Sequence, residues 1–232
     1  MKALPLQARQ VAKNFGLAPV LRSVKLEVSR GECVIIAGRN GSGKSTLIRI
    51  LAGLLSVTAG EVLLFGEPAR ALQAHDRRRV GLITHQSFLY PRLTARENLE
   101  FYAQLYGLED LGGTVSELLS QVGLGAAADE RVSAFSRGME QRLALARALI
   151  AKPDLLLMDE PFTALDAEGI QLATRLIGGA LDRGCATVIT AHDEAQFRRL
   201  TSTSYVLISG RLCSASVVSK ADQAMEHSAA AD

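Results

Sequence analysis

The sequence has no long run of apolar residues. Its longest apolar stretches, such as Leu155 to Met158 and Cys33 to Ala37, are far shorter than the roughly 18 residues needed to span a bilayer. We therefore expect that the chain cannot cross a membrane alone. The opening segment, MKALPLQARQ, also lacks the apolar core of about 7 to 15 residues that a secretory signal needs. Both absences predict a cytoplasmic protein.

The chain also has few cysteines and only a small excess of positive over negative charge. The three cysteines, Cys33, Cys185 and Cys213, are odd in number and widely separated, and each lies in an apolar, strand-like run. We expect small buried side chains there rather than a disulfide framework or a zinc site. A net charge of +2 gives no excess of positive charge for wrapping nucleic acid, so no direct nucleic-acid partner is expected. The arginine run at 77–79 is interpreted as a solvated corner between a helix and a strand.

What is present is an alternation of strand-like and helix-like segments. The 232 residues, 48% of them hydrophobic, can form a sizeable core in one large α/β domain or two small ones. Two β-rich segments, Leu4–Ala12 and Val20–Val28, predict an antiparallel edge sheet. Further strands are predicted at Cys33–Ala37, Glu61–Phe65, Val80–Thr84, Leu155–Met158 and Ala186–Thr190. Helices predicted between and after them at Ser45–Leu54, Ala167–Asp182 and Asp193–Leu200 imply a mainly parallel sheet in an α/β fold.

A mostly helical block extends from Thr94 to about Ala151. Thr94 and Glu97 have the spacing of a capping box, and Pro153 is expected to end the last helix. We interpret this block as a helical subdomain, about 88–151, inserted in a single domain that covers residues 1–214. The small and polar residues at 215–232 are expected to form a frayed tail.

The segment GRNGSGKS fits the phosphate-loop pattern G-x-x-x-x-G-K-[ST], and it lies between a predicted buried strand and a helix, as that motif requires. Its glycines allow backbone N–H groups to surround phosphates, its lysine supplies a positive charge, and its last hydroxyl can bind Mg²⁺. The pattern therefore predicts a nucleoside triphosphate site formed by Gly38, Arg39, Asn40, Gly41, Ser42, Gly43, Lys44 and Ser45. By itself it does not distinguish kinases, GTPases and ATPases.

Two adjacent carboxylates, Asp159 and Glu160, follow the predicted buried strand at Leu155–Met158. Ligands of open α/β sheets gather at this end of the strands. Asp159 is expected to hold Mg²⁺, while Glu160 is placed to orient and deprotonate the water that attacks the γ-phosphate. Because a kinase needs no such water base, the pair favours an ATP-hydrolysing enzyme.

Four further segments complete a known pattern. His85-Gln86 follows a strand, FSRGMEQR at 135–142 precedes a long helix, ALD at 164–166 follows the acidic pair, and His192 follows the next strand. In this order and spacing the sequence resembles the ATPases of ABC transporters, from about Leu4 to Leu212. The resemblance implies the ABC ATPase fold: a phosphate-loop core, an N-terminal antiparallel β subdomain and an inserted helical subdomain.

The resemblance also implies a head-to-tail dimer of two copies of the chain. Two ATP molecules with Mg²⁺ would lie between the phosphate loop of one copy and the segment Ser136 to Gly138 of the other, which begins a helix. The family usually has Leu-Ser-Gly-Gly-Gln where this chain has Phe-Ser-Arg-Gly-Met. Ser136 and Gly138, the residues expected closest to phosphate, are retained, so activity is expected.

The same resemblance implies roles for single residues. Gln86 would contact Mg²⁺ and the attacking water, His192 would bind the γ-phosphate, and Asp166 would connect the two ATP sites. Thr46 would add a phosphate contact. Phe15 occupies the place where the family stacks an aromatic ring on adenine, with a core phenylalanine as the alternative.

The type of ABC protein follows from the size of the chain. Only about ninety residues separate the phosphate loop from the FSRGM segment, whereas chromosome and repair ATPases of the superfamily have a long coiled coil there. Translation factors resemble two such domains in tandem. A single compact domain favours a transporter ATPase held at the cytoplasmic face of the inner membrane by integral membrane permease subunits. A soluble ATPase acting on ribosomes or nucleic acid is the alternative.

Two segments bear on the partner and the cargo. The stretch Ser87 to Pro91 lies where the family's membrane partner docks, although simple core packing explains its apolar residues equally well. The amino-acid sequence most resembles that of the haem-exporter ATPase of the cytochrome c maturation system, with lipid, polysaccharide or drug export as alternatives. No C-x-x-C-H motif for haem attachment is present. The resemblance implies that the membrane partner selects the cargo.

Overall fold

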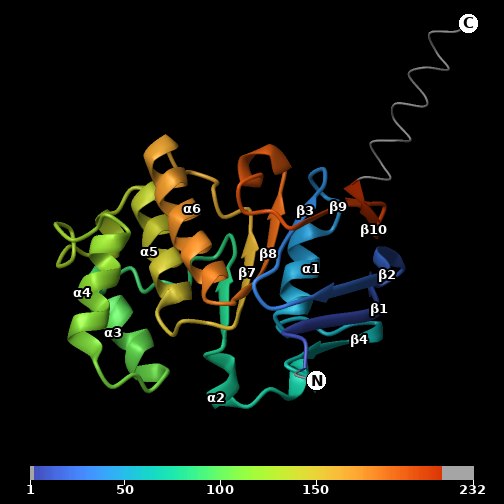
Figure 1. The fold of residues 1–232 in the computed structure, drawn as a ribbon, viewed down its shortest axis with the longest axis horizontal. Helices are drawn as coiled ribbons and strands as arrows, with labels where there is room; N and C mark the ends of the chain where they lie inside the picture. Colours follow the sequence, from blue (N-terminus) through green and yellow to red (C-terminus); the bar gives the residue numbers. More distant parts are fainter. Residues whose placement is uncertain (1–2, 216–232) are drawn as a thin grey trace, which may run out of the picture.

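The computed structural model describes residues 3–215 and contains two β-sheets flanked by helices (Figure 1). The tail predicted at 215–232 lies, apart from Ala215, outside the described residues. One sheet is antiparallel, has the strand order β2-β1-β4-β5, and consists of β1 (Leu6–Phe15), β2 (Ala18–Val28), β4 (Ala59–Leu64) and β5 (Glu67–Pro68). The predicted edge sheet is confirmed, and β4 extends it by pairing with β1.

The second sheet has the strand order β10-β9-β3-β8-β7-β6. Its strands are β3 (Cys33–Ala37), β6 (Val80–Ile83), β7 (Leu155–Asp159), β8 (Ala186–Ala191), β9 (Thr203–Ile208) and β10 (Arg211–Ser214). All neighbours pair in parallel except β9 and β10, which form a hairpin. The predicted, mainly parallel sheet is therefore confirmed. Strands β3, β7 and β8 are buried on both faces, which explains why they appear as continuous apolar runs.

Helices cover the parallel sheet and extend beyond it. They are α1 (Lys44–Leu51), α2 (Ala74–Arg77), α3 (Ala95–Leu105), α4 (Leu111–Gln121), α5 (Arg137–Leu149) and α6 (Ala167–Asp182), and short 3₁₀ turns occur at Ala69–Ala71, Val132–Ala134 and Glu194–Phe197. The prediction of a helix at Asp193–Leu200 was wrong. Only a four-residue 3₁₀ turn forms there, with Asp193 as its N-cap. The chain then bends toward β9, and the Ser202 N–H donates to the Cys33 carbonyl.

Three hydrophobic clusters hold these layers together. One joins the antiparallel sheet to α1 and one face of the parallel sheet, a second packs α6 and part of α5 on the other face, and a third lies among α3, α4 and α5. The predicted capping box at the start of α3 is present, since Thr94 accepts from the Glu97 N–H and Glu97 accepts from the Thr94 N–H. The subdomain boundaries at 88 and 151 and the single domain at 1–214 stay predictions.

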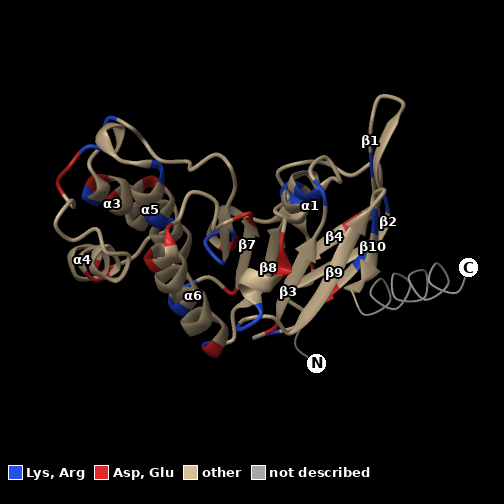
Figure 2. Ribbon diagram, turned by 90° about the horizontal axis from the view of Figure 1, so that it is seen from above, with Lys and Arg blue, Asp and Glu red and all other residues tan. Residues whose placement is uncertain are grey.

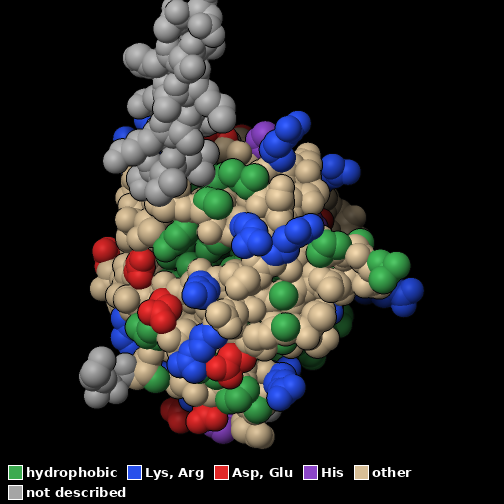
Figure 3. Space-filling view, turned by 90° about the vertical axis from the view of Figure 1, so that its right-hand side faces the viewer, with side chains coloured by type: hydrophobic (Ala, Val, Ile, Leu, Met, Phe, Trp, Pro, Cys, Tyr) green, Lys and Arg blue, Asp and Glu red, His purple; other side chains and the backbone are tan. Residues whose placement is uncertain are grey.

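The sparse residue types behave largely as expected. Cys33 and Cys185 are buried, Cys213 is only partly buried, and all three are free thiols. Burial raises the pKa of the Cys33 and Cys185 thiols to about 12, which keeps both protonated. Over the antiparallel sheet, lysine and arginine side chains lie among aspartate and glutamate (Figure 3). Among the described residues, no helix has the length and apolar character to span a bilayer.

Candidate functional site

The carboxyl ends of four neighbouring parallel strands meet at one edge of the six-stranded sheet (Figure 1). Strand register places Ala37 of β3 beside Ala191 of β8, and Asp159 of β7 beside Thr190 of β8. The residues that follow these strand ends, Gly38, Glu160 and His192, therefore share this edge. The loop after β6, which contains Gln86, joins it because Ile83 pairs with Met158. Segments distant in sequence thus form one polar site.

The phosphate loop connects β3 to α1 in a conformation that requires glycine. Gly41 and Gly43 have φ values of 78° and 105°, and Gly43 is the N-cap of α1. A Cβ atom on Gly38 would lie 2.7 Å from Ser42 Oγ and 3.0 Å from the Leu207 carbonyl oxygen. Side chains at these positions would displace the backbone that has to surround a phosphate. The loop motif therefore has the geometry that its sequence predicts.

Lys44 connects the loop to the acidic pair. Its side chain is only 5% exposed, and Nζ donates to the Gly38 carbonyl at 2.7 Å. The same Nζ lies 3.2 Å from Glu160 Oε1. The ammonium is therefore buried between a backbone carbonyl and a carboxylate, which compensate its charge. This is the contact that joins the phosphate loop to the end of β7.

The loop also lines a hollow that it shares with His192 and the end of β9. The hollow has a volume of about 770 Å³ and is lined by residues 37–42, His192 and the end of β9. Ser42 Oγ is buried beside it and has no hydrogen-bond partner within the described part of the chain. Arg39 and Asn40 are exposed at its rim, and Ser45 and Thr46 are partly exposed in the first turn of α1. An unpaired hydroxyl and a helix N-terminus both fit phosphate oxygens.

The acidic pair is positioned by β8. Asp159 is 2% exposed, and its Oδ1 accepts a hydrogen bond of 2.6 Å from Thr190 Oγ1, while His85 Nε2 lies 3.6 Å from its Oδ2. Glu160 has a left-handed φ of 50°, and its N–H donates to the Thr190 carbonyl at 3.1 Å. This turn directs the Glu160 side chain toward Lys44. Oxygen atoms of Ser45, Asp159 and Gln86 make a donor set that fits Mg²⁺.

Thr190 was not identified from the sequence, although the two threonines in the otherwise apolar strand β8 are the signal that could have revealed it. Thr190→Val keeps the side-chain shape but removes the donor to Asp159. We expect it to raise the Mg²⁺ concentration for half-maximal ATP hydrolysis roughly 10- to 100-fold, because residues that orient a metal ligand contribute on that order.

Thr187→Val is the matched control for that substitution. Thr187 is also fully buried on β8, and its hydroxyl has no partner within residues 3–215. Its removal should leave the Mg²⁺ dependence unchanged. An equal shift in both variants would show that Thr190 acts through packing rather than through Asp159.

The Ser136 to Gly138 segment lies apart from this site within one chain. Ser136 is the N-cap of α5 and accepts from the Met139 N–H at 3.2 Å, so position 139 contributes its backbone to the cap. Helices α1 and α5 are separated in two perpendicular views (Figures 1 and 2). The structure therefore does not bring Ser136 and Gly138 to the phosphate loop of the same chain.

Two hydrogen bonds connect α5 to the edge that carries the acidic pair, and sequence reasoning missed both. Ser87 Oγ donates to Glu140 Oε1 at 2.7 Å, and Gln141 Nε2 donates to the Pro161 carbonyl at 2.8 Å. Ser87 directly follows the exposed Gln86, and Pro161 directly follows Glu160. A movement of α5 would therefore displace the residues next to Gln86 and Glu160, two of the predicted catalytic residues.

Phe15 and Asp166 lie at the periphery. Phe15 is 52% exposed at the end of β1, with Lys13 Nζ 5.1 Å from its ring centroid, so the alternative of a core phenylalanine was wrong. Asp166 caps α6 by accepting from the Gly169 N–H at 2.8 Å. The adenine contact of Phe15 and the connecting role of Asp166 stay predictions.

Comparisons with known proteins agree with this geometry. The family model described as ABC transporter matches residues 21–163. A Nod factor export ATP-binding protein I from Burkholderia lata is 37% identical over 213 residues, covering 91% of this chain and 70% of the relative. Its counterpart from Bradyrhizobium diazoefficiens is 38% identical over 202 residues, covering 86% and 66%.

Solved structures give the same assignment. An ATP-binding subunit of an ABC transporter superposes with a TM-score of 0.84 at 28% identity, covering 90% of this chain and 88% of that one. A dimeric ATP-binding cassette in a post-hydrolysis state, bound to ADP and Pi, gives a TM-score of 0.80 at 29% identity, covering 89% and 96%. This chain, with its phosphate loop and acidic pair at one sheet edge, therefore belongs to the ABC transporter family as an ATP-binding, ATP-hydrolysing subunit.

Proposed function

We propose that this chain is the motor subunit of an exporter, held at the cytoplasmic face of the inner membrane by separate integral membrane permease subunits. The observation that carries the proposal is the contact between Lys44 and Glu160 at 3.2 Å, beside the buried Asp159. It supports a site in which Lys44 binds phosphate, Glu160 activates water and Asp159 binds the metal at one edge of the sheet.

Each residue then has a separate task in hydrolysis. Lys44 and the loop amides bind the phosphates, and Glu160 accepts the proton of the attacking water. His192 lines the hollow beside the phosphate loop and binds the γ-phosphate, while Gln86 orients the water from the loop after the neighbouring strand β6. Mg²⁺ held by Ser45, Asp159 and Gln86 would neutralise charge on the phosphate oxygens.

A second copy of the chain completes the site. Ser136 and Gly138 lie away from the phosphate loop of their own chain, although a helix N-terminus is suited to bind phosphate. The solved cassette bound to ADP and Pi is described as a dimer. We therefore propose that Ser136 and Gly138 of one copy contact the ATP held by the loop of the other.

Export through a membrane partner is supported by the relatives and by an exposed aromatic surface. The two curated relatives are named as export ATP-binding proteins. In the segment predicted to meet the partner, Phe88 is 41% exposed and Tyr90 is also exposed, whereas Leu89 is buried in the third cluster. Phe88 and Tyr90 are thus exposed for a partner contact, whereas Leu89 of the same segment packs in the core.

The cargo is assigned to the membrane partner. Haem export for cytochrome c maturation rests on the resemblance of the sequence, whereas the names of the relatives refer to Nod factor export. The test replaces the chromosomal copy by Glu160→Gln in the native host and stains membranes for covalently haem-bearing c-type cytochromes. Loss of the stained bands, with other membrane proteins intact, is the result expected for haem export. Unchanged bands in cells without a second copy would assign the motor to lipid, polysaccharide or drug export.

A further inference from the structure

The loop after β6 carries Gln86, whose side chain is exposed and makes no hydrogen bond within the described residues. The direction of the Gln86 amide is therefore set by the backbone of the loop. That backbone is held from within, because the buried Thr84 Oγ1 accepts from the Gln86 N–H at 3.2 Å and donates to the Gln86 carbonyl at 3.0 Å. Two further side chains hold it from outside, one from α3 and one from α5.

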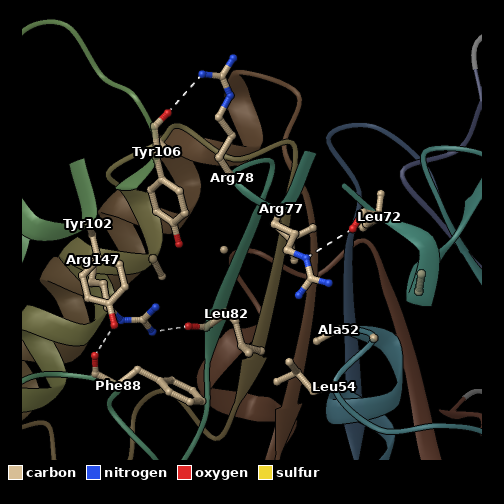
Figure 4. Close-up of a pocket in the computed structure, with 16 residues that line it drawn as sticks. Ala52, Leu54, Leu72, Arg77, Arg78, Leu82, Phe88, Tyr102, Tyr106 and Arg147 are labelled. Atoms are coloured by element: carbon tan, nitrogen blue, oxygen red, sulfur yellow. Dashed lines mark hydrogen bonds between the residues drawn. The ribbon is translucent and has the colours of Figure 1, made fainter. Parts of the chain in front are cut away.

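Tyr102 of α3 acts on Phe88, two residues after Gln86. Phe88 has a left-handed φ of 56°, a conformation that costs a non-glycine residue free energy. Its ring is partly exposed, so burial of the ring does not explain this conformation. The Tyr102 hydroxyl donates to the Phe88 carbonyl (Figure 4). Because Tyr102 is only 9% exposed, its hydroxyl would lose this partner inside the protein if the loop moved.

Arg147 of α5 connects the two ends of the same loop. Its side chain is 5% exposed, and its Nη2 donates to the Leu82 carbonyl at 2.5 Å. Its Cζ lies 5.6 Å from the Phe88 ring centroid and 5.4 Å from that of Tyr102. Leu82 precedes Gln86 and Phe88 follows it, so one guanidinium contacts both flanks of the loop (Figure 4).

Packing alone does not explain an arginine at position 147. Within the described residues it forms no ion pair with a carboxylate, and its Nε has no hydrogen-bond partner. A buried cation that is compensated only by a carbonyl and two aromatic rings is costly. A methionine would fill a similar volume on α5 without that cost. The link from α5 to both flanks of the loop is what the arginine adds.

We infer that Tyr102 and Arg147 are positioning residues for Gln86 in ATP hydrolysis. They hold the backbone on either side of Gln86 and thereby fix the place of its amide at the sheet edge. The inference rests on the proposed function, in which Gln86 orients the attacking water and contacts Mg²⁺. A displacement of about 1 Å is enough to slow a reaction strongly. Loss of either residue should therefore slow hydrolysis, while the phosphate loop still binds ATP.

The test is a double-mutant cycle of Tyr102→Phe and Gln86→Ala in the whole chain. Tyr102→Phe keeps the ring beside Arg147 and removes only the hydroxyl, so the fold should be retained. Turnover at saturating ATP and Mg²⁺ should fall roughly 3- to 10-fold, which is the effect of one neutral hydrogen bond, whereas the dissociation constant for ATP should stay parental. In a Gln86→Ala chain, Tyr102→Phe should change turnover no further, because the group that it positions is absent.

Tyr106→Phe is the matched control. It removes the same hydroxyl from a tyrosine that lines the same pocket as Tyr102, and the Tyr106 hydroxyl has no hydrogen-bond partner within the described residues. Its turnover should be parental. Arg147→Met is the second variant and should lower turnover roughly 10-fold or more, because a hydrogen bond from a charged group is lost. It too should add nothing to Gln86→Ala.

The outcomes separate the inference from the proposed function. Parental turnover in Tyr102→Phe, or the same further loss in the Gln86→Ala chain as in the parent, would overturn the inference and leave the role of Gln86 intact. An equal loss in Tyr106→Phe would overturn it as well. If Arg147→Met fails to fold, Tyr102→Phe decides alone. Parental turnover in Gln86→Ala would contradict the proposed role of Gln86 itself, and the inference would fall with it.

Discussion

We expect Glu160→Gln to bind ATP as the parent does but to hydrolyse it roughly 10²- to 10⁴-fold more slowly, which is the usual contribution of a general base. The glutamine amide keeps an oxygen that can accept from Lys44 Nζ, which lies 3.2 Å from Glu160 Oε1 in the parent. The contact with Lys44 is therefore retained in the variant. What is lost is the ability to take a proton from water. Phosphate release under saturating ATP measures turnover, and a fluorescent nucleotide measures affinity.

The exposed Glu168, in the first turn of α6, offers a matched control. Glu168→Gln changes the same functional group outside the site and should hydrolyse ATP normally. Because the slowed enzyme retains its nucleotide, Glu160→Gln should also accumulate as an ATP-stabilised dimer in light scattering. Normal turnover in Glu160→Gln would remove Glu160 from the role of base.

Lys44→Ala is expected to weaken ATP binding roughly 10- to 150-fold, the range given by losing a hydrogen bond to a charged group. Lys44 is buried, and its Nζ lies between the Gly38 carbonyl and Glu160 at the phosphate loop. Removing it leaves the phosphates without the one buried cation in the described phosphate loop. It also leaves Glu160 without its cation at the site where negative phosphate has to bind. Isothermal titration with ATP and Mg²⁺ measures the loss.

Lys25→Ala on the exposed face of β2 is the control, and it should bind ATP with parental affinity. Thermal unfolding of both variants separates a binding defect from a folding defect, because Lys44 also donates to the Gly38 carbonyl. Parental affinity in a folded Lys44→Ala would show that the loop binds phosphate without its lysine.

Local chemistry explains which parts of this site could be predicted from the sequence. The phosphate loop is a continuous motif. Its glycines and lysine act on backbone only a few residues away, so the pattern alone predicts the turn between β3 and α1. The acidic pair was found for the same reason, since it directly follows an apolar strand. The strand Cys33–Ala37 and the helix Ala167–Asp182 were predicted with the bounds that the structure gives them.

Contacts that depend on strand register could not be predicted. Thr190 meets Asp159 only because β7 and β8 pair in parallel with that alignment, and β4 joins β1 across more than forty intervening residues. Burial of Arg147 is equally non-local, because the segment LARAL has the composition of any amphipathic helix. Its environment is created by Phe88 and Tyr102, which come from other segments.

The most direct test of the account is ATP turnover by a mixture of two inactive variants, Lys44→Ala and Ser136→Arg. A head-to-tail dimer of the two has one site with both Lys44 and Ser136 intact, whereas neither variant alone can form such a site. We therefore predict that, at an ATP concentration well below the dissociation constant of Lys44→Ala, each variant is inactive by itself and mixing them restores hydrolysis. A mixture as inactive as its parts, or normal turnover in Ser136→Arg alone, would contradict an ATP site built from two copies of this chain.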